Sequence, residues 1–260
     1  FMIKHIFCDL DGTLYENGTI TKEDIVAIEE IEKKGVQFNV ATGRIFKQAH
    51  NIIKDSLDMN GYYVCENGSF IYDKDYNVIF KRTIDDNLVK KVIDRFESSD
   101  AQLYFKYKGD VIVGSDTTAF RHYSSDFIVD PDFEKRSSFD NLIGNIGVCS
   151  ENLEELSRIE LYLKSEFSEV LEIYFSGTYT LNIVPKSVSK RGSIEHVIKT
   201  LNVSPDEVAT IGDSPNDICM LEGFKYSFAM SKAREDVKQS ANYVVDSVKS
   251  AIDVIMEINS

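Results

Sequence analysis

The sequence has little of what builds a zinc site. Its four cysteines are widely scattered, none forms a Cys-x-x-Cys pair, and no histidine stands at zinc-ligand spacing from them. The four histidines have no catalytic-triad context either. Cys8 and Cys65 lie inside apolar runs, which is typical of buried thiols in a reducing compartment. We therefore expect a cytoplasmic protein that uses neither zinc nor a nucleophile activated by histidine.

Long apolar runs and excess positive charge are also missing. No apolar stretch approaches the roughly 18 residues needed to span a bilayer, and no secretory signal pattern opens the chain. The formal net charge is −14, which disfavours a nucleic-acid backbone as a partner. We expect no membrane, no nucleic acid and no obligate protein partner. An anionic ligand would need a local positive group or a bound cation.

The two ends of the chain alternate between short apolar runs and amphipathic segments. Ile25, Ile28 and Ile31 recur at helical spacing between Thr21, a plausible helix cap, and Gly35. Such alternation favours a parallel sheet joined by right-handed crossovers. The expected strands are 2–8, 36–41, 62–65, 208–211, 225–229 and 243–245, and the expected helices are 21–34, 44–56, 190–201, 215–221, 233–240 and 250–258.

The middle of the chain has a different pattern, in which helical segments accompany hairpins. Helices beside hairpins indicate an antiparallel sheet, and therefore an α+β insertion in an α/β fold. The predicted class is α/β, with a Rossmann-like parallel-sheet core at 1–83 and 186–260 and an inserted α+β domain at 84–185. The expected strands here are 70–72, 78–80, 103–107, 111–113, 143–149, 170–175 and 179–184, and the expected helices are 85–96 and 153–167.

The first apolar run ends abruptly in two carboxylates. The stretch KHIFCDLDGT, residues 4–13, places Asp9 and Asp11 one residue apart, and Gly12 then lets the chain turn. The alternation of a strand directs both side chains to one face. Like charges held this close push one pKa upward unless something positive binds there. The stretch is therefore either a solvated turn after a strand or a place where a positive group sits.

Four short polar segments lie at the ends of predicted strands or at the starts of predicted helices. Taken singly, each has an ordinary explanation: a turn with side-chain hydrogen bonds, a loop with a threonine cap, a solvated lysine, and a turn that caps a helix. Ligands of open parallel sheets bind outside the carboxyl ends of the strands, where all four segments could meet. The segments are 9–13 (DLDGT), 42–44 (TGR), Lys190 and 212–217 (GDSPND).

Together these segments have the chemistry of a phosphoryl-transfer site. Thr42 offers a hydroxyl and helix-start N–H groups, and Lys190 offers a point charge, both of which suit phosphate. One carboxylate can attack phosphorus, while a second can protonate the leaving oxygen and later activate water. The carboxylates offer only oxygen ligands, which suits Mg²⁺. They are Asp9, Asp11, Asp213 and Asp217.

The motifs strongly resemble those of the haloacid dehalogenase (HAD) superfamily of phosphohydrolases, in the Cof-type branch with a large α/β cap (class IIB, sugar-phosphatase-like). The resemblance covers the whole chain and keeps the order of the motifs. It implies a Mg²⁺-dependent phosphatase that hydrolyses a small phosphorylated metabolite through an aspartyl-phosphate, with sugar phosphates as the family's common substrates. It also implies that the cap sets substrate specificity. The matching segments are DLDGT (9–13), ATGR (41–44), SKRGSI (189–194) and GDSPND (212–217).

The same resemblance implies a role for each matching residue. Asp9 is the nucleophile, and Asp11 is the general acid/base, whose backbone carbonyl also meets Mg²⁺. The implied phosphate-binding residues are Leu10, Thr42, Gly43, Lys190 and Asn216. The implied metal ligands are Asp9, Asp11, Asp213 and Asp217, the last one directly or through water.

Two other functions are compatible with this fold. Related capped proteins pass the phosphoryl group to a sugar hydroxyl, as phosphomutases or phosphotransferases do. A non-catalytic regulatory protein that binds a phosphorylated ligand is the second alternative. It would carry a broken catalytic set, whereas Asp9, Asp11, Thr42, Lys190 and Asp213 are all present here.

Overall fold

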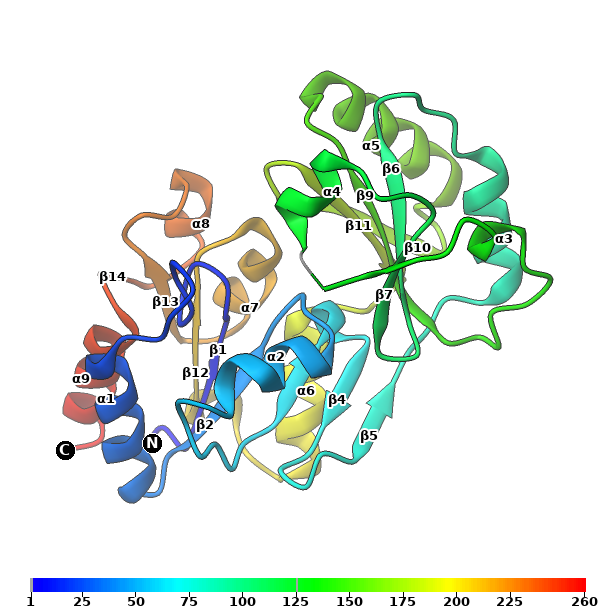
Figure 1. Cartoon of the computed structure of the whole chain (residues 1–260). Helices are drawn as coiled ribbons and strands as arrows, with labels where there is room; N and C mark the ends of the chain where they lie inside the picture. Colours follow the sequence, from blue (N-terminus) through cyan, green and yellow to red (C-terminus); the bar gives the residue numbers. More distant parts are fainter. Residues whose placement is uncertain (1, 125) are drawn as a thin grey trace. The chain divides into compact units, whose positions relative to one another are not determined.

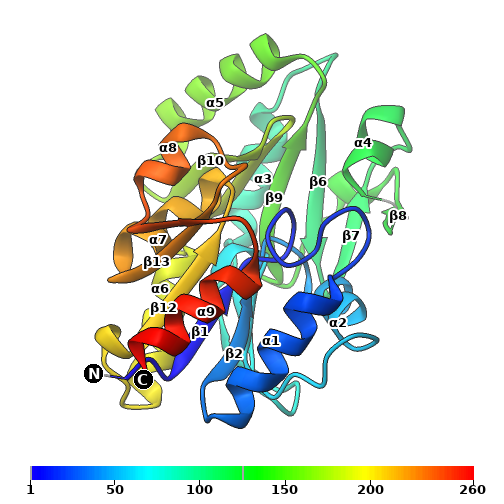
Figure 2. The same ribbon diagram turned by 90° about the vertical axis from the view of Figure 1, so that its left-hand side faces the viewer.

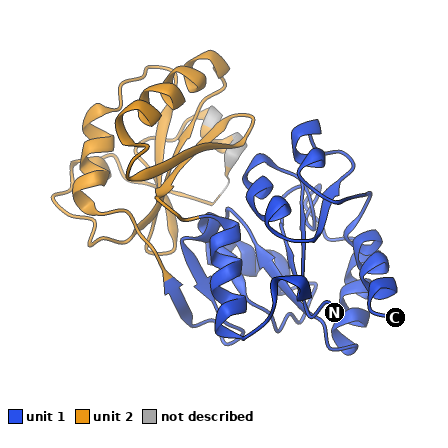
Figure 3. Cartoon of the chain, turned by 180° about the vertical axis from the view of Figure 1, so that it is seen from behind, with its two compact units in different colours: residues 1–80, 189–260 blue, residues 81–188 orange. Residues whose placement is uncertain are grey.

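The computed structural model describes residues 2–124 and 126–260, which divide into two compact units (Figure 3). Unit 1 comprises Phe1–Phe80 and Ser189–Ser260, and unit 2 comprises Lys81–Val188. The chain therefore leaves unit 1, builds unit 2 and returns. Within the described residues, none of the helices is both long and apolar enough to cross a bilayer.

Unit 1 is built on an eight-stranded sheet with the strand order β14-β13-β12-β1-β2-β3-β4-β5 (Figure 1). Strands β14 to β3 are parallel to one another, which confirms the predicted parallel sheet, and β4 pairs antiparallel with β3. β1 lies between β12 and β2, so its carboxyl end is at the middle of the sheet edge. The strands are β1 His5–Cys8, β2 Gln37–Ala41, β3 Tyr63–Cys65, β4 Phe70–Tyr72, β5 Val78–Lys81, β12 Val208–Gly212, β13 Tyr226–Met230 and β14 Tyr243–Val245.

Helices cover both faces of this sheet, because successive strand residues point to opposite faces. Ile6 and Cys8 of β1 belong to the core formed with α1, α2 and α9, whereas Phe7 belongs to the core formed with α6 and α7. α1 and α9 lie side by side (Figure 2), where the Asp24 carboxylate accepts a hydrogen bond from the Lys249 backbone N–H at 2.7 Å. The helices are α1 Lys22–Lys33, α2 Phe46–Ile53, α6 Lys190–Thr200, α7 Ile218–Gly223, α8 Glu235–Gln239 and α9 Val248–Ile258.

The first helix shows how local sequence sets these bounds. The Thr21 side chain accepts a hydrogen bond from the Asp24 backbone N–H at 3.1 Å, so it caps α1 as predicted. Gly35 follows the helix with φ +89°, a left-handed conformation that glycine adopts without strain. The buried Ile28 and Ile31 then pack on the sheet.

Unit 2 contains a six-stranded sheet with the order β10-β11-β9-β6-β7-β8. It is antiparallel, as predicted, except that β8 pairs parallel with β7. The short elements β8 and α4 were not predicted, because neither is long enough to show a clear hydrophobic period. The strands are β6 Gln102–Tyr107, β7 Asp110–Val113, β8 Ile128–Val129, β9 Ile143–Cys149, β10 Leu171–Gly177 and β11 Thr180–Pro185, and the helices are α3 Asp86–Arg95, α4 Thr118–Tyr123 and α5 Leu153–Phe167.

The two faces of the unit 2 sheet differ in chemistry. α3 and α5 pack on one face, in a core that includes Phe105 and Ile146. The neighbouring strand positions point the other way and are polar but buried: Lys106, Asn145 and Asn182 are at most 2% exposed. Among the described residues, no partner binds either polar atom of the Asn145 amide or Oδ1 of Asn182. The face opposite α3 and α5, on which Phe120 of α4 packs against Tyr104, therefore carries unused hydrogen-bonding capacity.

Candidate active site

Asp9 is held at the carboxyl end of the central strand of unit 1. Its backbone N–H donates to the Ile211 carbonyl at 2.9 Å, which extends the pairing of β1 with β12 one residue beyond β1. The residue is only 4% exposed. The apolar strand therefore fixes the Asp9 carboxylate at the sheet edge, where it is almost fully buried.

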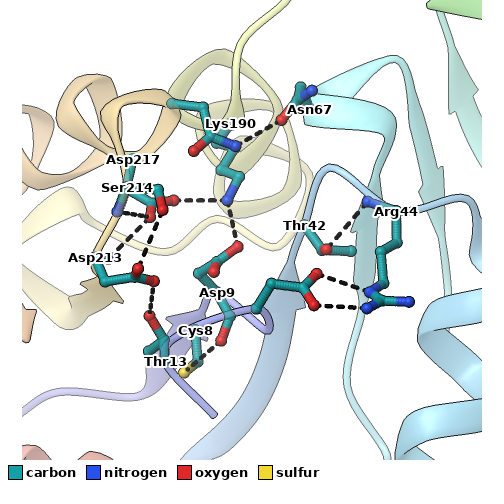
Figure 4. Close-up of polar contacts among 12 residues, drawn as sticks. Cys8, Asp9, Thr13, Thr42, Arg44, Asn67, Lys190, Asp213, Ser214 and Asp217 are labelled. Carbon is teal, nitrogen blue, oxygen red and sulfur yellow. Dashed lines mark hydrogen bonds and ion pairs between the residues drawn. The ribbon is translucent and has the colours of Figure 1, made fainter. Parts of the chain in front are cut away.

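Lys190 binds Asp9 from the first residue of α6. The Ser189 hydroxyl caps this helix by accepting a hydrogen bond from the Gly192 backbone N–H at 3.0 Å. Lys190 Nζ lies 2.5 Å from Asp9 Oδ1 and 2.6 Å from Asp217 Oδ1, and the lysine is 1% exposed (Figure 4). A buried ammonium thus joins two motifs that are far apart in the sequence.

The loop after β12 brings two more carboxylates to the same place. Asp217 Oδ2 accepts hydrogen bonds from the backbone N–H groups of Asp213 and Ser214, both at 2.9 Å. The Asp217 backbone N–H donates to the Ser214 carbonyl at 2.9 Å and closes a 3₁₀ turn at Pro215–Asp217, so the predicted helix 215–221 is in fact that turn followed by α7. Pro215 occupies the first turn, where its missing N–H costs nothing.

Gly12 and Thr13 hold the first motif against Asp213. Thr13 Oγ1 donates to Asp213 Oδ1 at 2.6 Å. Gly12 has φ +84°, and a Cβ at this position would lie 2.5 Å from Asp213 Oδ2. Only glycine satisfies both the left-handed backbone and this close approach.

The charges of the site do not balance. Burial raises the pKa of the Asp9 carboxyl well above its ordinary value; the Lys190 ammonium opposes this rise, and Asp217 and Asp213 add to it. Burial also raises the pKa of Asp213, again with a contribution from Asp217. Burial alone would lower the pKa of Lys190, but Asp217 and Asp9 outweigh it and raise that pKa above its ordinary value. One ammonium faces three carboxylates, so the site favours a further cation.

The geometry of the carboxylates fits a metal ion. One oxygen from each of Asp9, Asp213 and Asp217 lies within 4.8 Å of the others. Carboxylate oxygens without nitrogen or sulfur donors suit a hard cation such as Mg²⁺. The residues present therefore fit the metal that the motifs imply.

Asp11 does not join this group of three. Its side chain is half exposed and binds Arg44, which donates from Nε to Asp11 Oδ2 at 2.7 Å and from Nη2 to Asp11 Oδ1 at 2.6 Å. Arg44 was not predicted to have a role, although it stands in ATGR directly after Thr42 and Gly43. A bidentate pair with arginine fixes the orientation of the Asp11 carboxylate and also compensates its charge. Arg44 therefore belongs to the site.

Thr42 and Gly43 lie in a loop rather than at a helix start. The predicted helix 44–56 is wrong at its N-terminus, because α2 begins at Phe46 and Ile45 before it is extended. Thr42 Oγ1 instead accepts a hydrogen bond from the Arg44 backbone N–H at 3.1 Å, and the Thr42 N–H donates to the Val64 carbonyl at 2.8 Å. Thr42 is fully buried. Any anion bound here meets a turn of the backbone and not the N-terminus of α2.

The remaining predicted phosphate ligands are Leu10 and Asn216. Leu10 is buried in the core, so only its backbone can serve a ligand. Asn216 Nδ2 donates to Asn67 Oδ1 at 2.9 Å. Asn67 was not predicted as a site residue, because a lone asparagine after a strand is typical of an ordinary turn.

Comparison with known proteins identifies the family. The family model of the haloacid dehalogenase-like hydrolases matches residues 6–257, so the chain belongs to this family. It is 27% identical over 245 residues to the 5-amino-6-(5-phospho-D-ribitylamino)uracil phosphatase YcsE of Bacillus subtilis, covering 94% of this chain and 90% of that protein.

Solved structures of this family share the fold along the whole chain. A haloacid dehalogenase-like hydrolase from B. subtilis superposes with a TM-score of 0.89 at 22% identity, covering 98% of this chain and all of the other. The HAD subclass IIB sugar phosphatase BT4131 superposes with a TM-score of 0.80 at 22% identity, covering 98% of each chain. At these identities the likeness establishes the fold alone.

Proposed function

We propose that this hydrolase is a Mg²⁺-dependent phosphatase of the cytoplasm that cleaves a small phosphorylated metabolite through an aspartyl-phosphate on Asp9. The observation that carries the proposal is the buried contact between Lys190 Nζ and Asp9 Oδ1 at 2.5 Å. It orients the carboxylate from one side, and among the described residues none donates to Asp9 Oδ2. That oxygen is therefore the one available to attack phosphorus.

The two aspartates divide the reaction between them. Asp9 Oδ2 forms the new bond to phosphorus while the ester P–O bond breaks, and Asp11 gives a proton to the leaving oxygen. In the second half, Asp11 takes a proton from water, the water oxygen bonds to phosphorus, and the Asp9–phosphorus bond breaks to release inorganic phosphate. Arg44 keeps the Asp11 carboxylate oriented between these events.

The phosphoryl group needs positive and N–H partners around it. We assign this role to Lys190, Thr42, Asn216 and the backbone of Leu10 and Gly43. Mg²⁺ would be held by Asp9, the Asp11 carbonyl and Asp213, with Asp217 directly or through water. When bound, it would supply charge neutralisation for the phosphoryl oxygens and the carboxylates.

The proposed substrate class is a sugar phosphate or a related polyol phosphate. Two comparisons support it: one relative is named a phosphatase of a phospho-ribityl compound, and one structural neighbour is a sugar phosphatase. We propose that unit 2 is the inserted cap that sets specificity. Among its buried polar side chains, the amides of Asn145 and Asn182 suit hydroxyl groups, because an amide both donates and accepts hydrogen bonds, and the Lys106 ammonium can donate them.

Turnover in ¹⁸O-labelled water tests the proposal. The protein should hydrolyse p-nitrophenyl phosphate and a subset of a sugar-phosphate panel in the presence of Mg²⁺. Hydrolysis places one solvent oxygen in each inorganic phosphate released. Transfer of an unlabelled phosphoryl group to a sugar hydroxyl would instead identify a phosphotransferase, and a complete lack of turnover would contradict the enzyme assignment.

A further inference from the structure

The segment Glu66–Gly68 follows β3 in an unusual backbone conformation. Its three residues have φ values of +53°, +58° and +110°. Residues other than glycine rarely adopt this left-handed backbone conformation, although asparagine tolerates it better than most. Glu66 and Asn67 are nevertheless buried, at 4% and 1% exposure. Strain of this kind persists where the surroundings impose it, and it clusters at functional sites.

The surroundings that impose it are the motifs of the active site. The backbone N–H groups of Glu66 and Asn67 donate to the carbonyls of Arg44 and Thr42 at 2.9 and 3.0 Å. On the other side, the Ser193 hydroxyl of α6 donates to the Gly68 carbonyl at 2.7 Å. The segment therefore ties the Thr42–Arg44 loop to the first turn of the helix that carries Lys190.

Gly68 makes this contact possible. A Cβ at this position would lie 2.5 Å from the Ser189 carbonyl oxygen and 2.8 Å from Ser193 Oγ. The close approach leaves no room for a side chain. Segment 66–68 and the first turn of α6 thus pack backbone against backbone.

The Asn67 amide reaches two residues that we assign to the phosphoryl group. Its Oδ1 accepts the hydrogen bond from Asn216 Nδ2, and the same oxygen would lie 3.2 Å from a Cβ placed on Gly43. Within the described ranges, the Asn67 contact is the one hydrogen bond that orients the Asn216 side chain, because Asn216 Oδ1 is buried without a partner. Without Asn67 the Asn216 amide has no fixed direction.

We propose that Asn67 is a positioning residue of the phosphoryl site: it orients the Asn216 amide and, through segment 66–68, holds the Thr42–Gly43 loop against the helix of Lys190. The inference rests on the proposed phosphatase function and adds a residue outside the four motifs. Asparagine suits the position because it accepts the left-handed backbone and still presents an amide.

The exchange Asn67→Gly tests the role of the side chain, because glycine keeps the left-handed backbone. Asn202→Gly is the matched control: Asn202 also has a left-handed backbone, with φ +55°, but is exposed at the end of α6. The affinity for inorganic phosphate is measured by calorimetry and the KM for p-nitrophenyl phosphate by steady-state kinetics. We expect N67G to weaken both about tenfold, the size of one lost hydrogen bond to a charged ligand, and N202G to change neither.

A double-mutant cycle with Asn216→Ala separates positioning from general damage. In the N216A background, N67G should change the phosphate affinity by less than about twofold, because the amide that Asn67 orients is gone. Asn67→Ser, which is too short to reach Asn216, replaces N67G if that variant does not fold.

The proposal would be overturned if N67G lowered the phosphate affinity equally in the wild-type and N216A backgrounds. It would also be overturned if N67G left the phosphate affinity of the wild-type background unchanged. Phosphate affinity is measured without turnover. A wild-type protein that binds phosphate but hydrolyses nothing would therefore refute the phosphatase function, while the double-mutant cycle would still test whether Asn67 positions Asn216.

Discussion

Arg44 holds both carboxylate oxygens of Asp11, at 2.7 Å from Nε and 2.6 Å from Nη2. The pair connects the loop after β1 with the loop after β2, two neighbouring strands of the sheet. Because Asp11 is half exposed, the pair adds little to stability; its effect is to aim the proposed general acid/base.

Removing the arginine should therefore affect catalysis more than folding. We expect Arg44→Ala to lower kcat for p-nitrophenyl phosphate about tenfold, since Asp11 loses its fixed orientation. Arg44→Lys should recover only part of this loss, because lysine has no bidentate fork. Arg191→Ala, which removes an exposed arginine paired with Glu195 on α6, is the control and should leave kcat unchanged.

Asp9→Asn should abolish turnover. The amide is isosteric but not nucleophilic, so kcat should fall by at least about a thousandfold. Acid quenching of wild-type enzyme with ³²P-labelled substrate should trap a phosphoprotein that D9N does not form. Asp58→Asn, at an exposed position of unit 1, is the control. Substantial activity in D9N would contradict the nucleophile assignment.

Chelation with EDTA should remove activity, and added Mg²⁺ should restore it. Asp213→Asn deletes one charge from the three-carboxylate group, so the Mg²⁺ concentration for half-maximal activity should rise at least about tenfold. Asp206→Asn, on the exposed turn before β12, should leave the Mg²⁺ requirement unchanged. Full activity in metal-free buffer would rule out the metal.

Substrate choice should depend on the polar face of the unit 2 sheet. Asn145→Ala should lower kcat/KM for sugar phosphates about tenfold and leave kcat/KM for p-nitrophenyl phosphate within twofold, since the aryl group offers no hydroxyls to the amide. Val148→Ala on the same strand faces the helices and is the control. V148A should lower stability without changing the ratio of kcat/KM for sugar phosphates to kcat/KM for p-nitrophenyl phosphate. An unchanged ratio in N145A would contradict a role of this sheet face in substrate choice.

A separate prediction concerns stability and follows from the packing on the polar face of the unit 2 sheet. A Cβ on Gly147 would lie 1.8 Å from Cζ of the Tyr104 ring, so Gly147→Ala must displace the ring or the strand. We expect a loss of about 1–3 kcal/mol in the free energy of unfolding, measured by urea denaturation. At Gly114 in the same unit the nearest atom would be 3.6 Å away, so Gly114→Ala should cost far less.

The sequence predicted most of the fold because its patterns are local. Ile25, Ile28 and Ile31 mark the buried face of α1, and the capping residue Thr21 marks its start. α2 was placed two residues early, because a helix start and a tight turn look alike until it is known that the Thr42 hydroxyl binds the Arg44 N–H. α4 and β8 are too short to show a period.

The candidate site could be predicted in part for the same reason. Asp9, Lys190, Asp213 and Asp217 meet in one group, and their motifs are distinctive in sequence. Arg44 and Asn67 were not recognised, because each acts through a contact with a residue that is remote in the chain. Arg44 binds Asp11, and Asn67 binds Asn216. Contacts of this kind have no local signature.

The pairing of β1 with β12 has a consequence for the time course of synthesis. The Asp9 backbone N–H bonds to the Ile211 carbonyl, so the first strand lacks one of its two neighbours until about 200 residues more have been made. At about 5–20 residues per second, this wait is on the order of 10–40 s. For most of this wait, the nascent chain has its proposed nucleophile but neither Lys190 nor Asp213. On the proposed mechanism, activity therefore waits until the segment that carries Lys190 and Asp213 has left the ribosome.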